Sequence, residues 1–177
     1  MQSKKHGFSS EAAYVLGILT MALGTAMMAS ADFGMSMVVA PAYLTYLKLS
    51  QTLPFFTFGM AEYLLQALLL VALGGVLRRF RLSYLFSFVT AVLYGLALDG
   101  AMLLMSLLPQ TREIWIRCVY YALGIYITTG GVAFLFHTYF MPEAYELFVK
   151  EISRHYGLDL YRFKRYYDYT SMAVSVA

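Results

Sequence analysis

Four long apolar stretches constrain the fold of this chain more than any other feature. Each is close to the 20 or so mostly apolar residues that a helix needs to cross a bilayer core. A soluble domain has no surface for them, since 60% of the residues are hydrophobic and only 13% are charged. We predict an all-α, polytopic membrane protein whose complete spans are Ala12 to Ser30, Phe55 to Leu77, Tyr84 to Leu107 and Ile114 to Tyr139.

A fifth apolar run begins near Tyr166 and reaches Ala177, about half the length of a span. We expect the natural protein to continue for about 40 residues on this basis. The start resembles a signal peptide, because Lys4 and Lys5 precede an apolar run. We interpret it as the first span, since the run exceeds the usual signal length of about 7–15 apolar residues.

Basic residues predict the orientation, because Lys and Arg concentrate on the cytoplasmic side of membrane proteins. They fall into three short groups, at 4–5, 78–81 and 150–165. All three lie inside if the N-terminus is cytoplasmic and the segments 32–54 and 109–113 are outside. The formal charge of +3 is spread over these groups, so we predict no nucleic-acid partner.

The sequence carries no signature of an enzyme, a metal site or a cofactor. Cys118 is the only cysteine, which excludes a disulfide framework and a thiolate cluster. No phosphate-binding loop, nucleophile elbow, zinc-binding helix or dinucleotide fingerprint occurs. We therefore expect no enzymatic activity, no cofactor and no bound metal.

The first span recurs in the fourth at a constant spacing of 107 residues. After both copies a proline opens a helical segment, at Pro41 and at Pro142. Glu62 and Tyr63 then match Asp168 and Tyr169 at a spacing of 106. The matching residues are Tyr14, Leu16, Gly17, Ile18, Gly24 and Ala26 with Tyr121, Leu123, Gly124, Ile125, Gly131 and Ala133.

This repetition predicts inverted repeats of three spans plus a proline-started helix, within one membrane domain over 1–177. Repeat one covers 11–107 and repeat two covers 118–177, so the second is incomplete. An odd number of crossings per unit inverts the second copy, and inverted repeats are typical of secondary transporters. The alternative is chance similarity between two spans rich in glycine and alanine.

Three motifs carry a resemblance over nearly the whole chain. They are Ala31-Asp-Phe-Gly-Met-Ser, Phe58-Gly-Met-Ala-Glu-Tyr and Pro142-Glu-Ala-Tyr-Glu-Leu-Phe-Val-Lys-Glu-Ile-Ser, the last followed by Lys164 and Asp168. With them the chain resembles the YitT/YczE-type family of bacterial integral membrane proteins. The resemblance implies a multi-pass protein of the bacterial plasma membrane that continues through further spans, and it implies no reaction.

Charged side chains inside spans are candidates for a binding site, because each costs about 2.5–3.5 kcal/mol on insertion scales. Counting 1.5 Å per residue places Glu62 and Asp99 at similar depths, about 10 and 12 Å below the outer surface. Arg117 begins span four nearby. The candidate substrate-binding residues are Asp32, Ser36, Glu62, Asp99 and Arg117, whose acidic excess favours a cationic or zwitterionic ligand. The alternative is a structural ion pair of Arg117 with Asp99 or Glu62.

The two proline-containing segments have different predicted roles. We expect Ala31 to Ser50 to be re-entrant, since irregular backbone is tolerated where protein surrounds it. We expect 142–156 to be an amphipathic helix at the cytoplasmic interface, with Tyr145, Phe148 and Ile152 on one face. Such a helix acts as an anchor or as a gate.

Small residues at four-residue spacing predict where the spans pack closely. They are Ala22, Ala26 and Ser30 in span one, Ala91 and Gly95 in span three, and Gly124 and Thr128 in span four. Alternatively, Ala22 and Ala26 dock a partner, as a similar motif does in the substrate-binding subunits of energy-coupling-factor importers.

The leading functional prediction is a transporter of a small cationic or zwitterionic solute, with its site between the repeats. A substrate-binding subunit of such an importer and a non-transporting membrane sensor or scaffold remain as alternatives. The expected partners are the lipid bilayer, a small-molecule ligand, and a second copy or partner subunit at a small-residue helix face.

Overall fold

The computed structural model describes residues 10–78, 82–108, 113–136, 138 and 143–176. Over these residues the chain forms seven helices and no strand. Four of them, α1, α3, α4 and α5, are long and apolar enough to cross a membrane, which confirms an all-α, polytopic membrane protein. The helices are α1 (Ser10–Ala31), α2 (Ala40–Leu49), α3 (Phe58–Leu77), α4 (Leu82–Ser106), α5 (Ile114–Phe136), α6 (Ala144–Tyr156) and α7 (Leu160–Val176).

The spans agree with the sequence prediction to within a few residues. The largest difference is at α3, which begins at Phe58 rather than at Phe55. Thr57 has an extended backbone, and its side chain accepts a hydrogen bond from the Met60 N–H. This N-cap satisfies an amide that the first turn leaves without a helical partner, so the helix starts after it. The predicted end of span four at Tyr139 lies outside the described residues.

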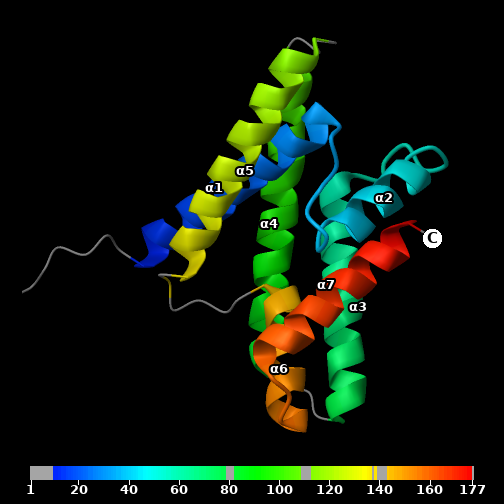
Figure 1. Cartoon of the computed structure of the whole chain (residues 1–177), viewed down its shortest axis with the longest axis vertical. Coiled ribbons are helices and arrows are strands. Elements are labelled where there is room, and N and C mark those ends of the chain that lie inside the picture. The colour runs from blue at the N-terminus through cyan, green and yellow to red at the C-terminus, as the bar shows by residue number, and fades with distance from the viewer. Residues whose placement is uncertain (1–9, 79–81, 109–112, 137, 139–142, 177) are drawn as a thin grey trace, which may run out of the picture.

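The most extensive helix contact joins α1 and α5, which run antiparallel through facing glycines (Figure 1). Gly17 lies against Gly131, and Gly24 lies against Gly124. A Cβ atom added at Gly24 would come within 2.6 Å of the Gly124 carbonyl oxygen. The two backbones therefore pack closely, which confirms the predicted packing role of Gly124. The other three glycines were singled out only as matching residues of the repeats.

Helix α4 packs on both α1 and α3 and joins them into one bundle. Two buried hydrogen bonds join it to α1, from Tyr14 Oη to Thr90 Oγ1 (2.8 Å) and from Tyr94 Oη to Thr25 Oγ1 (3.0 Å). Toward α3, Gly95 lies against Gly59. Hydroxyl pairs of this kind satisfy each other where lipid offers no partner.

The predicted small-residue stripe of span one packs against other helices of the same chain. Ala22 and Ala26 are fully buried and belong to the core formed by α1, α3 and α4. They therefore present no surface to a partner in this structure.

Helix α2 lies beside the upper part of α3, on the side away from α1 and α5, whereas α7 passes in front of α3 and α6 lies at the lower end of the bundle near α4 (Figure 1). Helix α2 packs on α3 and α7, and α6 packs on α3, α4 and α7. The segment before α2 runs down beside the bundle, and α2 then turns back (Figure 1). That course is the one expected for a re-entrant segment.

Helix α6 differs from its predicted interfacial position. Its first amide, at Ala144, donates to Gln66 Oε1 (3.2 Å), and Gln66 lies near the middle of α3. Its buried side chains Tyr145, Leu147 and Ile152 face other helices, because a helix that starts at mid-span must be enclosed by protein. The amphipathic pattern was correct, but the position at the membrane surface was wrong.

The contact between α1 and α5 can be tested by adding one methyl group to a facing glycine. In Gly131→Ala the new Cβ would lie 2.7 Å from the Met21 amide nitrogen and 2.9 Å from the Gly17 carbonyl oxygen. Such overpacking costs about 1–3 kcal/mol. We expect a lower melting temperature in detergent, measured by tryptophan fluorescence or static light scattering.

Gly130→Ala is the matched control, because a Cβ there has no atom within 4 Å. Both variants gain the same helix propensity from alanine, so their difference reports the α1–α5 contact. Equal melting temperatures for the two variants would contradict the contact.

Candidate functional site

The structure separates the five predicted site residues into different environments. Arg117 at the start of α5 donates from Nε to the Ala31 carbonyl oxygen (2.8 Å). Its Nη2 donates to the backbone oxygen and to Oδ2 of Asp32, both at 3.2 Å. Arg117 thus joins α5 to the end of α1, and the predicted ion pair of Arg117 with Asp99 or Glu62 was wrong. Asp32 is 81% exposed in its side chain, so this pair contributes little by charge alone.

Asp99 on α4 caps the first turn of α3. Its Oδ1 accepts from the Gly59 N–H and its Oδ2 accepts from the Thr57 hydroxyl, both at 2.7 Å. Ser36 is exposed in the segment before α2, and its carbonyl oxygen accepts the amides of Val39 and Ala40. Both residues hold local backbone in place, and the structure brings neither to Glu62 by a direct hydrogen bond among the described residues.

Glu62 lies in a second polar group, one helical turn or about 4.5 Å deeper along α3 than Gly59. The side chain is fully buried. Its Oε1 accepts from the Tyr145 hydroxyl (2.9 Å) and from Gln66 Nε2 (3.3 Å), while its Oε2 has no hydrogen-bond partner. With the bond from Ala144 to Gln66, these contacts attach the start of α6 to α3.

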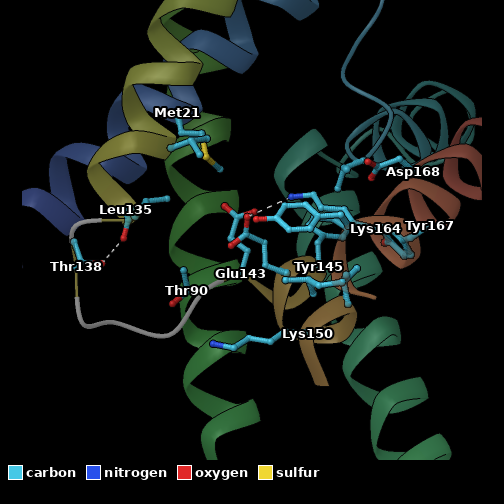
Figure 2. A pocket seen from close by; sticks show the side chains of 16 residues that line it. Met21, Thr90, Leu135, Thr138, Glu143, Tyr145, Lys150, Lys164, Tyr167 and Asp168 are labelled. Atoms are coloured by element: carbon cyan, nitrogen blue, oxygen red, sulfur yellow. Dashed lines mark hydrogen bonds and ion pairs between the residues drawn. The ribbon is translucent and has the colours of Figure 1, made fainter. Parts of the chain in front are cut away.

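A cavity of about 600 Å³ opens beside this group, between α1, α4 and α5 on one side and α6 and α7 on the other. Figure 2 shows side chains of α6 and α7 facing Met21 of α1 and Leu135 of α5 across it. Its volume suits a small organic ligand. The lining residues are Met21, Val38, Thr90, Val132, Leu135, Thr138, Glu143, Tyr145, Glu146, Val149, Lys150, Leu160, Tyr161, Lys164, Tyr167 and Asp168.

The cavity residues were not the ones that sequence reasoning selected. None of the five predicted residues lines it, although Glu62 bonds Tyr145, which does. The charged lining residues are Glu143, Glu146, Lys150, Lys164 and Asp168. A signal for Asp168 existed, because it is the repeat partner of Glu62, and Glu143 follows the proline of the repeated helix.

Glu143 is the lining residue with the most unusual environment. Its Oε1 is buried and has no hydrogen-bond partner. Burial, and secondarily the nearby carboxyl groups of Glu62 and Glu146, raises the pKa of Glu143 to about 8. A positive charge placed beside it would offset both effects. Asp168 Oδ1 also lacks a hydrogen-bond partner, whereas Glu146 pairs with Lys164 at 3.7 Å (Figure 2).

The chain belongs to a family of unknown function (DUF6198), whose model matches residues 8–177. No curated protein and no solved structure matches it. Function must therefore be argued from the cavity and from the helices that form it.

Asp99→Asn tests whether Asp99 caps α3 or binds a ligand. An amide cannot accept both bonds that the carboxylate accepts from Thr57 and Gly59. We expect a loss of about 0.5–2 kcal/mol in stability, the usual cost of a lost N-cap. Thermal unfolding in detergent measures this loss. Glu113→Gln, which removes an exposed carboxylate ahead of α5, is the control and should leave the melting temperature unchanged.

Proposed function

We propose that this member of a family of unknown function is a membrane transporter for a small cationic or zwitterionic solute. The solute binds in the cavity between a first half, α1 to α4, and a second half, α5 to α7. The observation that carries the proposal is the pair of lining carboxylates, Glu143 and Asp168, which keep buried oxygen atoms without hydrogen-bond partners. The proposal includes the bacterial plasma membrane, which the family resemblance implies, and a cytoplasmic N-terminus, which the basic residues predict.

Reciprocal contacts between α1 and α5 support inverted repeats. A two-fold axis that exchanges repeated residues sends Gly17 to Gly124 and Gly131 to Gly24. It therefore converts the contact of Gly17 with Gly131 into that of Gly124 with Gly24, and both contacts occur. Reciprocity of this kind is the property of a two-fold interface.

The neighbours of the short helices follow the same exchange. It pairs α1 with α5, α2 with α6 and α3 with α7. Helix α2 packs on α3 and α7, while α6 packs on α7 and α3. A site between the halves then corresponds to the position where inverted-repeat transporters bind their substrates, at helices that begin or end within the membrane.

The charges of the cavity favour a positive group on the solute. Glu146 already pairs with Lys164, which leaves Glu143 and Asp168 with free acceptor oxygens. A positive charge beside either carboxyl group offsets the cost of its burial, and an ammonium group that carries N–H bonds also donates to the free oxygen. Lys150, which also lines the cavity, provides a partner for the carboxylate of a zwitterion.

Solute binding by the purified protein tests the proposal. We expect choline, tetramethylammonium, betaine or basic amino acids to raise the melting temperature, because a ligand at 100 times its Kd stabilises by about 2.7 kcal/mol. Glu143→Gln and Asp168→Asn should lower the affinity at least tenfold, and Glu113→Gln should not. The stabilising solute should also enter proteoliposomes that contain the protein. Stabilisation by dicarboxylates alone, or none by any amine, would contradict the proposal.

Affinity for a cation should rise with pH through the pKa of Glu143. Below about pH 8 the carboxyl holds a proton that the cation must displace, so affinity falls by up to about tenfold per unit. Above that pH the carboxylate is already ionised, and affinity reaches a plateau. A quaternary ammonium ion is the right probe, because its own charge does not change between pH 6 and 9. Glu143→Gln should make the profile shallower, and an affinity that rises toward acid pH would exclude this role.

A further inference from the structure

We infer that Glu62 is a proton-binding site: its carboxyl group holds a proton in the resting protein and releases it when a cation occupies the cavity. The resting proton site is independent of the proposed function. Release on occupation of the cavity rests on that function.

Within the described structure, Glu62 has hydrogen-bond donors but no counter-charge. Both donors, the Tyr145 hydroxyl and the Gln66 amide, are neutral, and both bond Oε1. Among the described residues, no lysine, arginine or histidine forms an ion pair with it. A fully buried carboxylate without a cation costs several kcal/mol, and protonation removes that cost. The unpartnered Oε2 is then the oxygen that carries the proton.

In the part of the chain that the structure describes, none of the titratable groups around Glu62 supplies a positive charge. The titratable groups that interact with it are Tyr94 from α4, Tyr145 from α6 and Tyr167 from α7, together with Glu143 before α6. From α2, Tyr43 and Tyr46 pack on Phe58 at the start of α3, and Lys48 is exposed. Every titratable group described around Glu62 is therefore a phenol or another carboxyl.

Glu62 is connected to the cavity through Tyr145, although it does not line the cavity. Tyr145 lines the cavity and donates to Glu62, and Glu143 lies two residues before Tyr145. Where Glu143 is already ionised, a cation beside it adds a positive charge near Glu62, which favours the ionised form of Glu62. The O–H bond at Oε2 then breaks, the proton leaves to solvent, and Glu62 remains as a carboxylate.

Proton release also changes the attachment of α6. Hydrogen bonds to an ionised acceptor are shorter and roughly twice as strong as neutral ones. The bond from Tyr145 therefore tightens when Glu62 ionises, and it pulls the start of α6 toward α3. A cation in the cavity would thus exchange for a proton and fix α6 in one step.

Infrared difference spectroscopy of the solute-free protein tests the proton site. We expect the carbonyl-stretching band of a protonated carboxyl at neutral pH, and we expect this band to be lost at high pH. Glu62→Gln should remove one band and Glu143→Gln another, while Glu113→Gln should keep both. Tyr145→Phe should shift the Glu62 band to higher frequency, since the carbonyl oxygen loses its donor.

If Glu62→Gln does not fold, Tyr145→Phe still tests the site. An unshifted carboxyl band in Tyr145→Phe would contradict the assignment of a proton to Glu62. A Glu62→Gln spectrum identical to that of the wild type would contradict it as well. A sodium ion is the competing occupant. If NaCl raises the melting temperature more than KCl does, and Glu62→Gln abolishes this difference, the site binds a metal ion and the assignment of a proton is wrong.

Proton release tests the coupling step separately. Choline is added to weakly buffered protein, and released protons are counted with a pH dye per choline bound. The wild type should release protons, and Glu62→Gln should release fewer by at least half per bound choline. Binding without release, with the Glu62 band intact, overturns the coupling step alone. If no amine binds but the Glu62 band is present, the proposed function and the coupling step are both wrong, and the proton site remains.

Discussion

The close backbone contact between α1 and α5 is the interaction on which the rest of the structure depends. In lipid, apolar side chains gain nothing by leaving their surroundings, so van der Waals contact between small residues must hold helices together. Gly17, Gly24, Gly124 and Gly131 supply that contact. It fixes how the two halves of the chain meet, and the cavity lies in the space that remains between them.

A second constraint explains how a helix can begin in the middle of the bundle. The first amides of a helix have no helical partner, and within a membrane they must be satisfied by protein. Gln66 accepts the bond from Ala144, and Glu62 accepts the bond from Tyr145. Two polar residues of α3 therefore permit α6 to start where it does, and α6 in turn brings Glu143 to the cavity.

Sequence patterns predicted the elements well, but they did not indicate which residues line the cavity. Span length and hydropathy depend on local residues only, so the four spans were predictable, as were the close contacts at Gly95 and Gly124. The position of α6 was not, because an amphipathic pattern is the same whether the apolar face meets lipid or protein. The predicted depth in the membrane was the reason for grouping Glu62 with Asp99. Depth does not give the direction of a side chain, and Asp99 turns toward Thr57 and Gly59. Nothing in the spacing of Glu143 predicted its buried, unpartnered oxygen.

The polar residues fall into two groups, those whose buried atoms have hydrogen-bond partners and those with a buried oxygen that has none. Asp99 and Gln66 have partners that account for their burial, since each holds a helix start in place. Glu143 has none at Oε1, and Asp168 has none at Oδ1. A buried acceptor without a partner lowers stability by about 1–3 kcal/mol, and no helix start in the described structure depends on these two atoms. Glu62 belongs to both groups, because one oxygen holds α6 and the other is free. Because one oxygen of Glu62 holds α6 and the other is free, Glu62 is suited to link occupation of the cavity to the position of α6.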